Sequence, residues 1–209
     1  YTIYSDKINS KSQYKYRDVE VFVMGLVFNP FNNDRNIENI TKELAHRLSK
    51  SVDKFLDHLD ELSGRFIVVT SKNDKTEVYH DACATRTVFY NKYGDSTVIA
   101  SHSAIIGELL NIEPSKYSVE MLNHPTYSGV RYLPGLLSPY DDVLPLTPNT
   151  KYTIETKKVE RYYPRRPLKN AGKWSLNRKI NNIIDLMIRQ AENITAMDKV
   201  SISLTAGID

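Results

Sequence analysis

The stretch Glu20-Val21-Phe22-Val23-Met24-Gly25-Leu26-Val27-Phe28 decides the fold class of this chain. Apolar residues occupy both alternating faces of the stretch, which predicts a central strand that is buried on two sides. Asn29-Pro30 ends this strand, and Asn32-Asn33-Asp34 predicts a turn after it. Residues 1–17 are polar and rich in Tyr, Lys and Ser, so we expect an edge segment or a poorly ordered start there.

A helical pattern follows the turn. Its apolar residues recur at steps of three and four, namely Ile37, Ile40, Leu44, Leu48, Val52, Phe55, Leu56 and Leu59. This spacing predicts an amphipathic helix or a helix pair, with a break near Ser49–Ser51.

Short strands and short helices are predicted next. The strands are Phe66–Ser71, Thr76–His80, Thr87–Tyr90 and Thr97–Ser101, with turns at Asn73-Asp74 and around Gly94-Asp95. Helices are expected at Ser103–Leu110 and Ser118–Asn123, and a last hairpin at Tyr152–Glu155 and Val159–Tyr162. This mixture predicts an α+β domain.

Pro164 and Pro167 indicate a domain boundary at about residue 165. Beyond it, Ser175 is the expected N-cap of a helix with a clean apolar stripe: Leu176, Ile180, Ile183, Ile184, Met187, Ile188 and Ala191. A strand at 200–204 follows. A helix, a strand and a small-residue turn are the opening of a parallel α/β sheet.

Composition limits the function. The 209 residues are 41% hydrophobic and 25% charged, with a net charge of +3. The charges are interspersed, which argues against nucleic acid as a partner, and no apolar run is long enough for a membrane span. The basic segment Arg161–Arg166 is interpreted as a solvated linker, with an anion contact as the alternative. The single cysteine, Cys83, excludes an internal disulfide and fits a cytoplasmic location. We expect Cys83 to be a small core residue.

The segment Leu204-Thr205-Ala206-Gly207-Ile208-Asp209 follows the last predicted strand. Backbone N–H groups in such a turn can bind phosphate oxygens, and Gly207 would allow close approach. Asp209 could hold a Mg²⁺ ion that bridges phosphates. Taken alone, the segment is more often an ordinary turn at the end of a strand than an anion site.

This segment resembles a nucleotide-binding motif of a known family. Leu204–Asp209 resembles the pyrophosphate loop Leu-Ser-Gly-Gly-x-Asp-Ser of the asparagine synthetase family, with Thr205 and Ala206 as departures. Upstream motifs resemble the same family in the same order: Leu62–Phe66, His80–Tyr90, Ile99–His102, Arg131–Gly135, Pro145–Ile154 and Arg161–Tyr163.

The resemblance implies two domains. Residues 1–165 would be a glutaminase-like domain, a four-layer αββα sandwich of the N-terminal-nucleophile type. Residues 166–209 would begin an ATP-pyrophosphatase domain, with Leu204, Thr205, Ala206, Gly207 and Asp209 binding ATP and Asp209 also binding Mg²⁺. The substrates implied are a small-molecule carboxylate and an amine or ammonia. Because the loop's closing Ser would follow Asp209, we expect the sequence to stop inside a nucleotide-binding loop.

The glutaminase half departs from the family at its catalytic positions. The family's nucleophile is an N-terminal Cys, whereas this chain begins with Tyr1. The family's oxyanion segment is Asn-Gly-Glu, and the matching residues are Met24 and Gly25, of which Met24 cannot donate a hydrogen bond. Asp81 is expected to order a turn. His80 and Asp81 are neighbours in sequence and should point to opposite faces, which argues against a catalytic pair.

Three functions remain open. The first is the N-terminal part of an ATP-dependent, amide-forming enzyme whose glutaminase site is inactive. The second is a non-catalytic scaffold that acts through a homodimer or a partner protein. The third is a working glutaminase whose catalytic Cys is missing from this sequence; Met24 argues against it.

Overall fold

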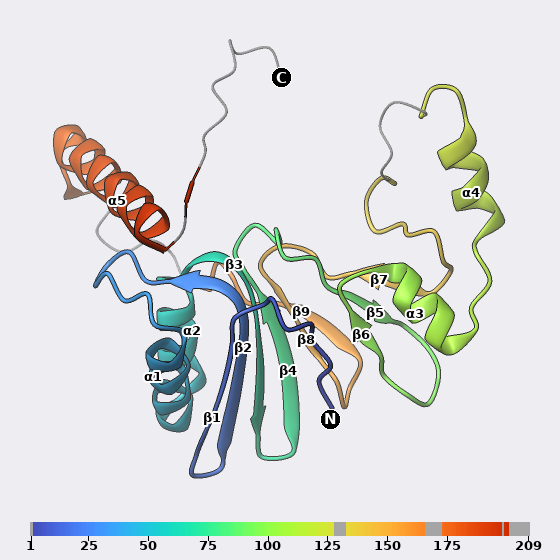
Figure 1. The fold of residues 1–209 in the computed structure, drawn as a ribbon, viewed down its shortest axis with the longest axis horizontal. Coiled ribbons are helices and arrows are strands. Elements are labelled where there is room, and N and C mark those ends of the chain that lie inside the picture. The colour runs from blue at the N-terminus through green and yellow to red at the C-terminus, as the bar shows by residue number, and fades with distance from the viewer. Residues whose placement is uncertain (1, 128–132, 166–172, 198, 201–209) are drawn as a thin grey trace.

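The computed structural model describes residues 2–127, 133–165, 173–197 and 199–200. It is a mixed α+β structure with two antiparallel sheets (Figure 1). The larger sheet has the strand order β1-β2-β3-β4-β8-β9. These strands are β1 (Lys11–Tyr16), β2 (Val19–Phe28), β3 (Ser63–Lys72), β4 (Lys75–His80), β8 (Thr150–Thr153) and β9 (Lys158–Arg161). The α+β class predicted from the sequence is therefore confirmed.

β2 is the strand that the apolar stretch predicts, and it lies between β1 and β3. Val19, Val21, Val23 and Val27 are fully buried on one face. Phe22 is buried on the other face and belongs to a second core cluster. The prediction of burial on two sides fails at one position, because Leu26 is 40% exposed.

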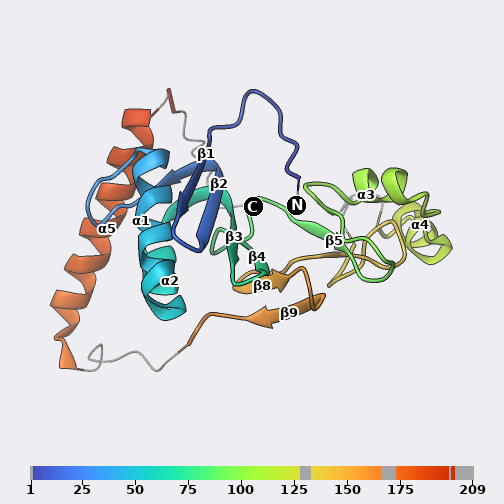
Figure 2. The same cartoon turned by 90° about the horizontal axis from the view of Figure 1, so that it is seen from below.

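Two helices cover one face of the larger sheet (Figure 2). α1 (Ile37–Lys50) and α2 (Val52–Leu59) are separated at Ser51, whose side-chain oxygen accepts a hydrogen bond from the N–H of Lys54 at 3.2 Å. The predicted break is thus a shared cap, which ends one helix and begins the next. The helices bury their apolar stripe against β2 and its neighbours: Ile40, Leu44, Leu48, Phe55, Leu56 and Leu59.

A smaller sheet packs against the other face. Its strand order is β6-β5-β7, with β5 (Phe89–Asn91), β6 (Ile99–Ala100) and β7 (Val143–Pro145). Side chains of both sheets form one core cluster, and the rings of Tyr90 in β5 and Tyr152 in β8 have centroids 4.5 Å apart. α3 (Ser103–Leu110) contacts all three strands of the smaller sheet, and α4 (Lys116–Asn123) follows it.

Arg165, at the predicted domain boundary, forms ion pairs with carboxylates at the end of α2. Arg165 contacts Asp57 and Asp60, each at 2.7 Å, and its side chain is only 14% exposed. The interpretation of this basic segment as a solvated linker is therefore wrong at Arg165, because Asp57 in α2 and Asp60 directly after α2 each offer a carboxylate there. α5 (Leu176–Met197) comes after the boundary, and Ser175 accepts a hydrogen bond from the N–H of Arg178 at 3.4 Å, as expected for its N-cap.

Two glycines hold β2 and β3 in close contact. Gly25 has φ +116° and Gly64 has φ +129°, a region that side chains rarely adopt. A Cβ atom at Gly64 would collide with the carbonyl oxygen of Leu26, and one at Gly25 with the carbonyl oxygen of Arg65. Each glycine is therefore required by the backbone of the opposite strand.

We predict that Gly64→Ala lowers the free energy of unfolding by more than about 3 kcal/mol, because it adds both strain and a backbone collision. Gly135→Ala is the matched control: Gly135 has φ +63° and no atom within 4 Å of its missing Cβ. The control should cost only about 1 kcal/mol, the price of a left-handed Ala. Urea denaturation of both variants measures the difference, and equal losses would contradict the prediction.

Candidate functional site

The predicted oxyanion position lies in β2, where it faces β1 and β3. Met24 is opposite Lys11 and Ile67, and its half-buried side chain packs on the core cluster between the two sheets. The N–H of Gly25 donates to the carbonyl oxygen of Ser10 at 2.8 Å. A thioether offers no N–H or O–H group, and this backbone N–H already has an acceptor. The Met24 side chain and the Gly25 N–H therefore present no free donor to an oxyanion.

The segment that supplies Ser10 has its own local order. The Asp6 carboxylate accepts from the backbone N–H of Asn9 at 3.0 Å and from its side-chain amide at 2.5 Å. Lys11 donates to the Ser5 hydroxyl at 2.8 Å. The hydrogen bonds from Asn9 lower the pKa of Asp6, and the charge of Arg86 adds a smaller effect. The start of the chain thus forms a closed turn that leads into β1.

Asp81 orders a turn, as predicted. Its carboxylate accepts from the N–H and the hydroxyl of Thr85, both at 2.9 Å, and from the N–H of Arg86 at 2.8 Å. This cradle encloses Ala84, which has a left-handed φ of +53°. The same loop carries Cys83, which is exposed. The expectation of a core cysteine is wrong, because the hydrogen-bonded turn holds residue 83 outside the sheets.

His80 lies in the core beside this turn. Its Nε2 is 2.9 Å from the carbonyl oxygen of Thr147, which sets Nε2 as the donor, and its Nδ1 is buried without a partner. Burial lowers the pKa of His80, and the nearby Thr147 carbonyl and Asp81 charge offset only part of this effect. His80 and Asp81 share no hydrogen bond among the described contacts, and the argument against a catalytic pair stays a prediction.

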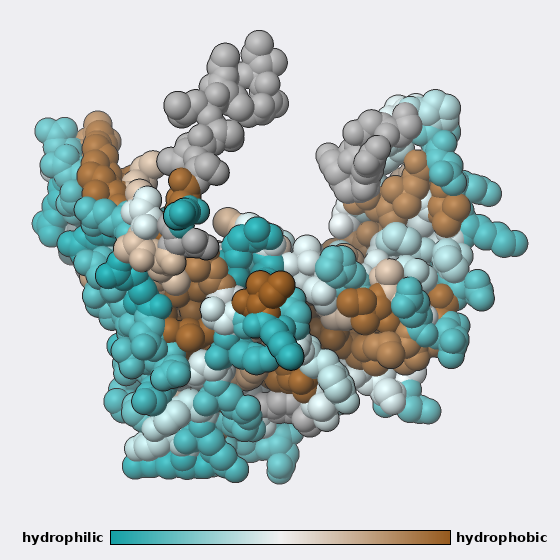
Figure 3. Space-filling view, viewed as in Figure 1, coloured by the Kyte–Doolittle hydropathy of each residue, from teal (hydrophilic) through white to brown (hydrophobic). Residues whose placement is uncertain are grey.

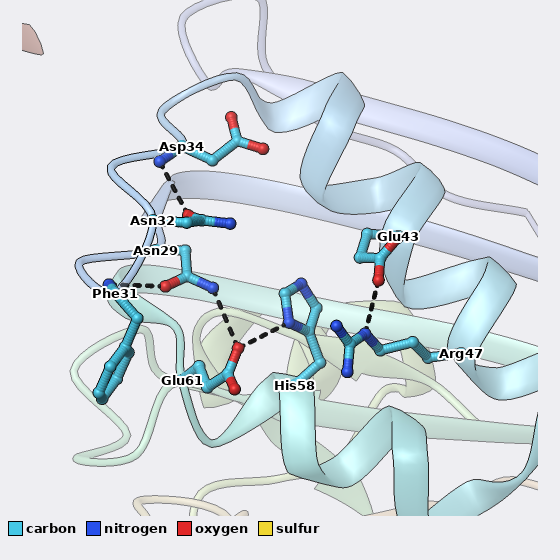
Figure 4. A network of polar contacts seen from close by, with 8 residues as sticks. All are labelled: Asn29, Phe31, Asn32, Asp34, Glu43, Arg47, His58 and Glu61. Carbon is cyan, nitrogen blue, oxygen red and sulfur yellow. Dashed lines mark hydrogen bonds and ion pairs between the residues drawn. The ribbon is translucent and has the colours of Figure 1, made fainter.

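Sequence reasoning missed a polar network at the end of β2 (Figure 4). Asn29, 1% exposed, donates to the Glu61 carboxylate at 3.2 Å, and Nδ1 of His58 lies 3.0 Å from the same oxygen. The side chain of Asn29 also accepts from the N–H of Phe31 at 2.8 Å. The available signals were an Asn directly after a buried strand and a His and Glu three residues apart. This network holds a loop in place and contains no nucleophile.

The other site predicted from the sequence is the ATP-binding segment at the end of the chain. Leu204, Thr205, Ala206, Gly207 and Asp209 lie outside the described residues. Within the described ranges, no group of three His, Cys, Asp or Glu side chains is arranged to hold a metal ion. Each helix in those ranges is also too short or too polar to cross a lipid bilayer.

Comparisons with known proteins do not assign this chain to a family. No protein-family model matches the chain, and neither does any curated protein. Among solved structures, the chain is similar to glutamine phosphoribosylpyrophosphate amidotransferase from B. subtilis, in a complex with ADP and GMP. That match has a TM-score of 0.41 and 13% sequence identity, and it covers 75% of this chain and 32% of the other. The chain thus spans about a third of that protein, and the resemblance to asparagine synthetases stays a prediction.

We predict that the buried, neutral His80 makes stability depend on pH. Its pKa is lower in the folded chain than in the unfolded chain, where it is about 6.5. The unfolded state therefore binds a proton first, and the free energy of unfolding should fall as pH drops below about 6.5. Denaturant midpoints at pH 7.5, 6.5 and 5.5 measure this slope.

His80→Gln keeps a donor for the Thr147 carbonyl but cannot be protonated, so it should flatten the slope. His102→Gln is the control, because His102 is exposed and, among the described residues, its hydrogen bond is to the adjacent Ser101 hydroxyl at 2.8 Å. An unchanged slope in His80→Gln would refute the assignment.

Proposed function

We propose that this chain is the N-terminal part of an ATP-dependent, amide-forming enzyme whose glutaminase-like domain no longer hydrolyses glutamine. The observation that carries the second half of this proposal is the hydrogen bond from Gly25 to Ser10 at 2.8 Å. Glutamine hydrolysis requires donors aimed at the developing oxyanion. Here the backbone donor is already used, the Met24 side chain offers none, and the sole thiol, Cys83, is mid-chain and exposed.

The order of layers supports the finer fold within this proposal. α1 and α2 cover the larger sheet, the larger sheet packs on the smaller one, and α3 contacts the smaller sheet. We take these as the four layers of an αββα sandwich. α5 and the strand predicted after it would then begin the ATP-pyrophosphatase domain.

The synthetic half of the proposal rests on the sequence of the loop Leu204–Asp209. In such an enzyme the substrate carboxylate attacks the α-phosphate of ATP and pyrophosphate leaves. An amine or ammonia then attacks the acyl carbon and AMP leaves. Thr205 and Gly207 would bind the pyrophosphate portion of ATP, and Asp209 would hold the Mg²⁺ that neutralises its charge.

A scaffold is the second candidate, and exposed apolar side chains favour it. Ile105 and Leu109 of α3 are 43% and 64% exposed, and Tyr117 of α4 is 62% exposed. Figure 3 shows hydrophobic surface over α3 and along α5, on opposite sides of the molecule. Apolar surface of this kind marks protein contacts. A homodimer or a partner protein would cover it.

We predict that the complete protein releases pyrophosphate from ATP in the presence of its carboxylate substrate. Ammonium should serve as nitrogen donor, and glutamine should give no rate above the donor-free control. Asp209→Ala should lower the rate at least about 100-fold, because the charge on the leaving group loses its Mg²⁺. Coupled pyrophosphate detection across a panel of carboxylates and amines measures these rates.

Cys83→Ser is the matched control and should leave the ammonium-dependent rate unchanged. A glutamine-dependent rate that disappears in Cys83→Ser would instead identify Cys83 as a thiol nucleophile and overturn the inactive-glutaminase assignment. Absence of nucleotide binding by the complete protein, together with a stable dimer or heterocomplex, would favour the scaffold.

A further inference from the structure

The loop from Asn29 to Asn36 joins β2 to α1 and is shaped by its own side chains. Asn32 accepts from the N–H of Asp34, and Asp34 accepts from the N–H of Asn36, both at 3.0 Å. Asn36 then caps α1 by accepting from the N–H of Glu38 at 2.8 Å. Figure 4 shows the contact between Asn32 and Asp34, and beside it the separate contacts of Asn29 with Phe31 and Glu61. These side-chain turns fix the loop locally.

The loop is also held by contacts from α2 and from the residues that follow this helix. Glu61, two residues after the end of α2, accepts from the Asn29 amide, and Nδ1 of the buried His58 lies 3.0 Å from the same carboxylate oxygen. Asn29 in turn pairs with the other end of the loop, since its N–H donates to the carbonyl oxygen of Asp34 at 2.8 Å. These hydrogen bonds therefore hold both ends of the loop in place.

α5 contacts the Asn29–Asn36 loop through polar groups. Arg189 donates to the carbonyl oxygen of Phe31 at 3.1 Å, and the amide of Asn193 donates to the side-chain oxygen of Asn33 at 3.1 Å. Asn193 is the buried residue of α5, with 2% exposure. The apolar stripe of the same helix stays exposed, with Met187 at 66% and Ile183 at 59%.

The contact at Asn193 is incomplete. Its amide nitrogen donates to both Asn33 and the carbonyl oxygen of Arg189, which fixes the orientation of the amide. Its oxygen is buried and has no hydrogen-bond partner. A buried oxygen without a donor weakens the bound arrangement. Next to it is a cavity of about 130 Å³, lined by Asn33, Arg35, Glu192 and Asn193. Water can therefore reach the edge of the contact.

We propose that the Asn29–Asn36 loop is a docking surface for the polar face of α5, and that this contact opens and closes reversibly, with Asn193 as its positioning residue. A small, polar contact with one unpaired oxygen is readily exchanged for contacts with water, unlike an apolar core. The loop would thus couple the position of whatever follows α5 to the end of β2. The contact joins described residues only, and its opening does not depend on the chemistry that the whole protein performs.

Hydrogen exchange of the α5 amides, followed by mass spectrometry on the full chain, tests the docking. Asn193→Ala removes the donor, and Asn33→Gly removes the acceptor while fitting the left-handed φ of +60° at that residue. Each should speed exchange in α5 about tenfold, the size expected for the loss of one hydrogen-bonded contact. Exchange in β3 should not change, which separates undocking from global unfolding.

Two matched variants keep the contact. Asn33→Asp retains the acceptor oxygen, and Asn182→Ala removes an exposed Asn from the same helix. Both should leave α5 exchange within about twofold of the original chain or slower, because Ala favours helix. The proposal is overturned if Asn193→Ala behaves like Asn182→Ala, if Asn33→Asp loosens α5 as much as Asn33→Gly, or if α5 is unprotected in the original chain.

Discussion

The fold depends on the two-sided burial of β2. Its valines pack on α1 and α2, while Phe22 packs on the cluster between the two sheets. One strand therefore contributes to both hydrophobic cores, and a change in its register would expose both sets at once. Gly25 and Gly64 add to this constraint, since they allow β2 and β3 to approach where any side chain would collide with backbone.

Some residues that the sequence predicts to belong to a site have structural roles in the described fold. Gly25 and Asp81 each have a structural role: Gly25 fits against Arg65, and Asp81 holds its turn through three hydrogen bonds. Met24 sits beside Gly25, and its side chain joins the core between the sheets. This apolar side chain stabilises the domain through its packing and offers no N–H or O–H donor.

The sequence predicted most helices and strands because their signals are local. Apolar spacing located α1, α2 and α5, and the break between α1 and α2 fell at Ser51 as expected. The failures involve contacts between distant segments. Arg165 was taken for a solvated residue because its partners, Asp57 and Asp60, lie about one hundred positions earlier in the chain. The contact of Asn29 with Glu61, which lies 32 residues later, was missed for the same reason. The exposure of Cys83 has a local cause, the turn that Asp81 forms with Thr85 and Arg86. The pyrophosphate loop lies outside the described residues, so that part of the site stays a prediction.

The order of strands in the larger sheet has a further consequence for handling the protein at high concentration. β1 and β9 form its two edges, where unpaired backbone groups could recruit strands from other molecules. β1 exposes Lys11 and Lys15, and all four residues of β9 are exposed, three of them charged. Charge on both edges opposes edge-to-edge pairing of sheets from different molecules. Aggregation, where it occurs, should therefore begin at the helices with exposed apolar side chains rather than at the sheet.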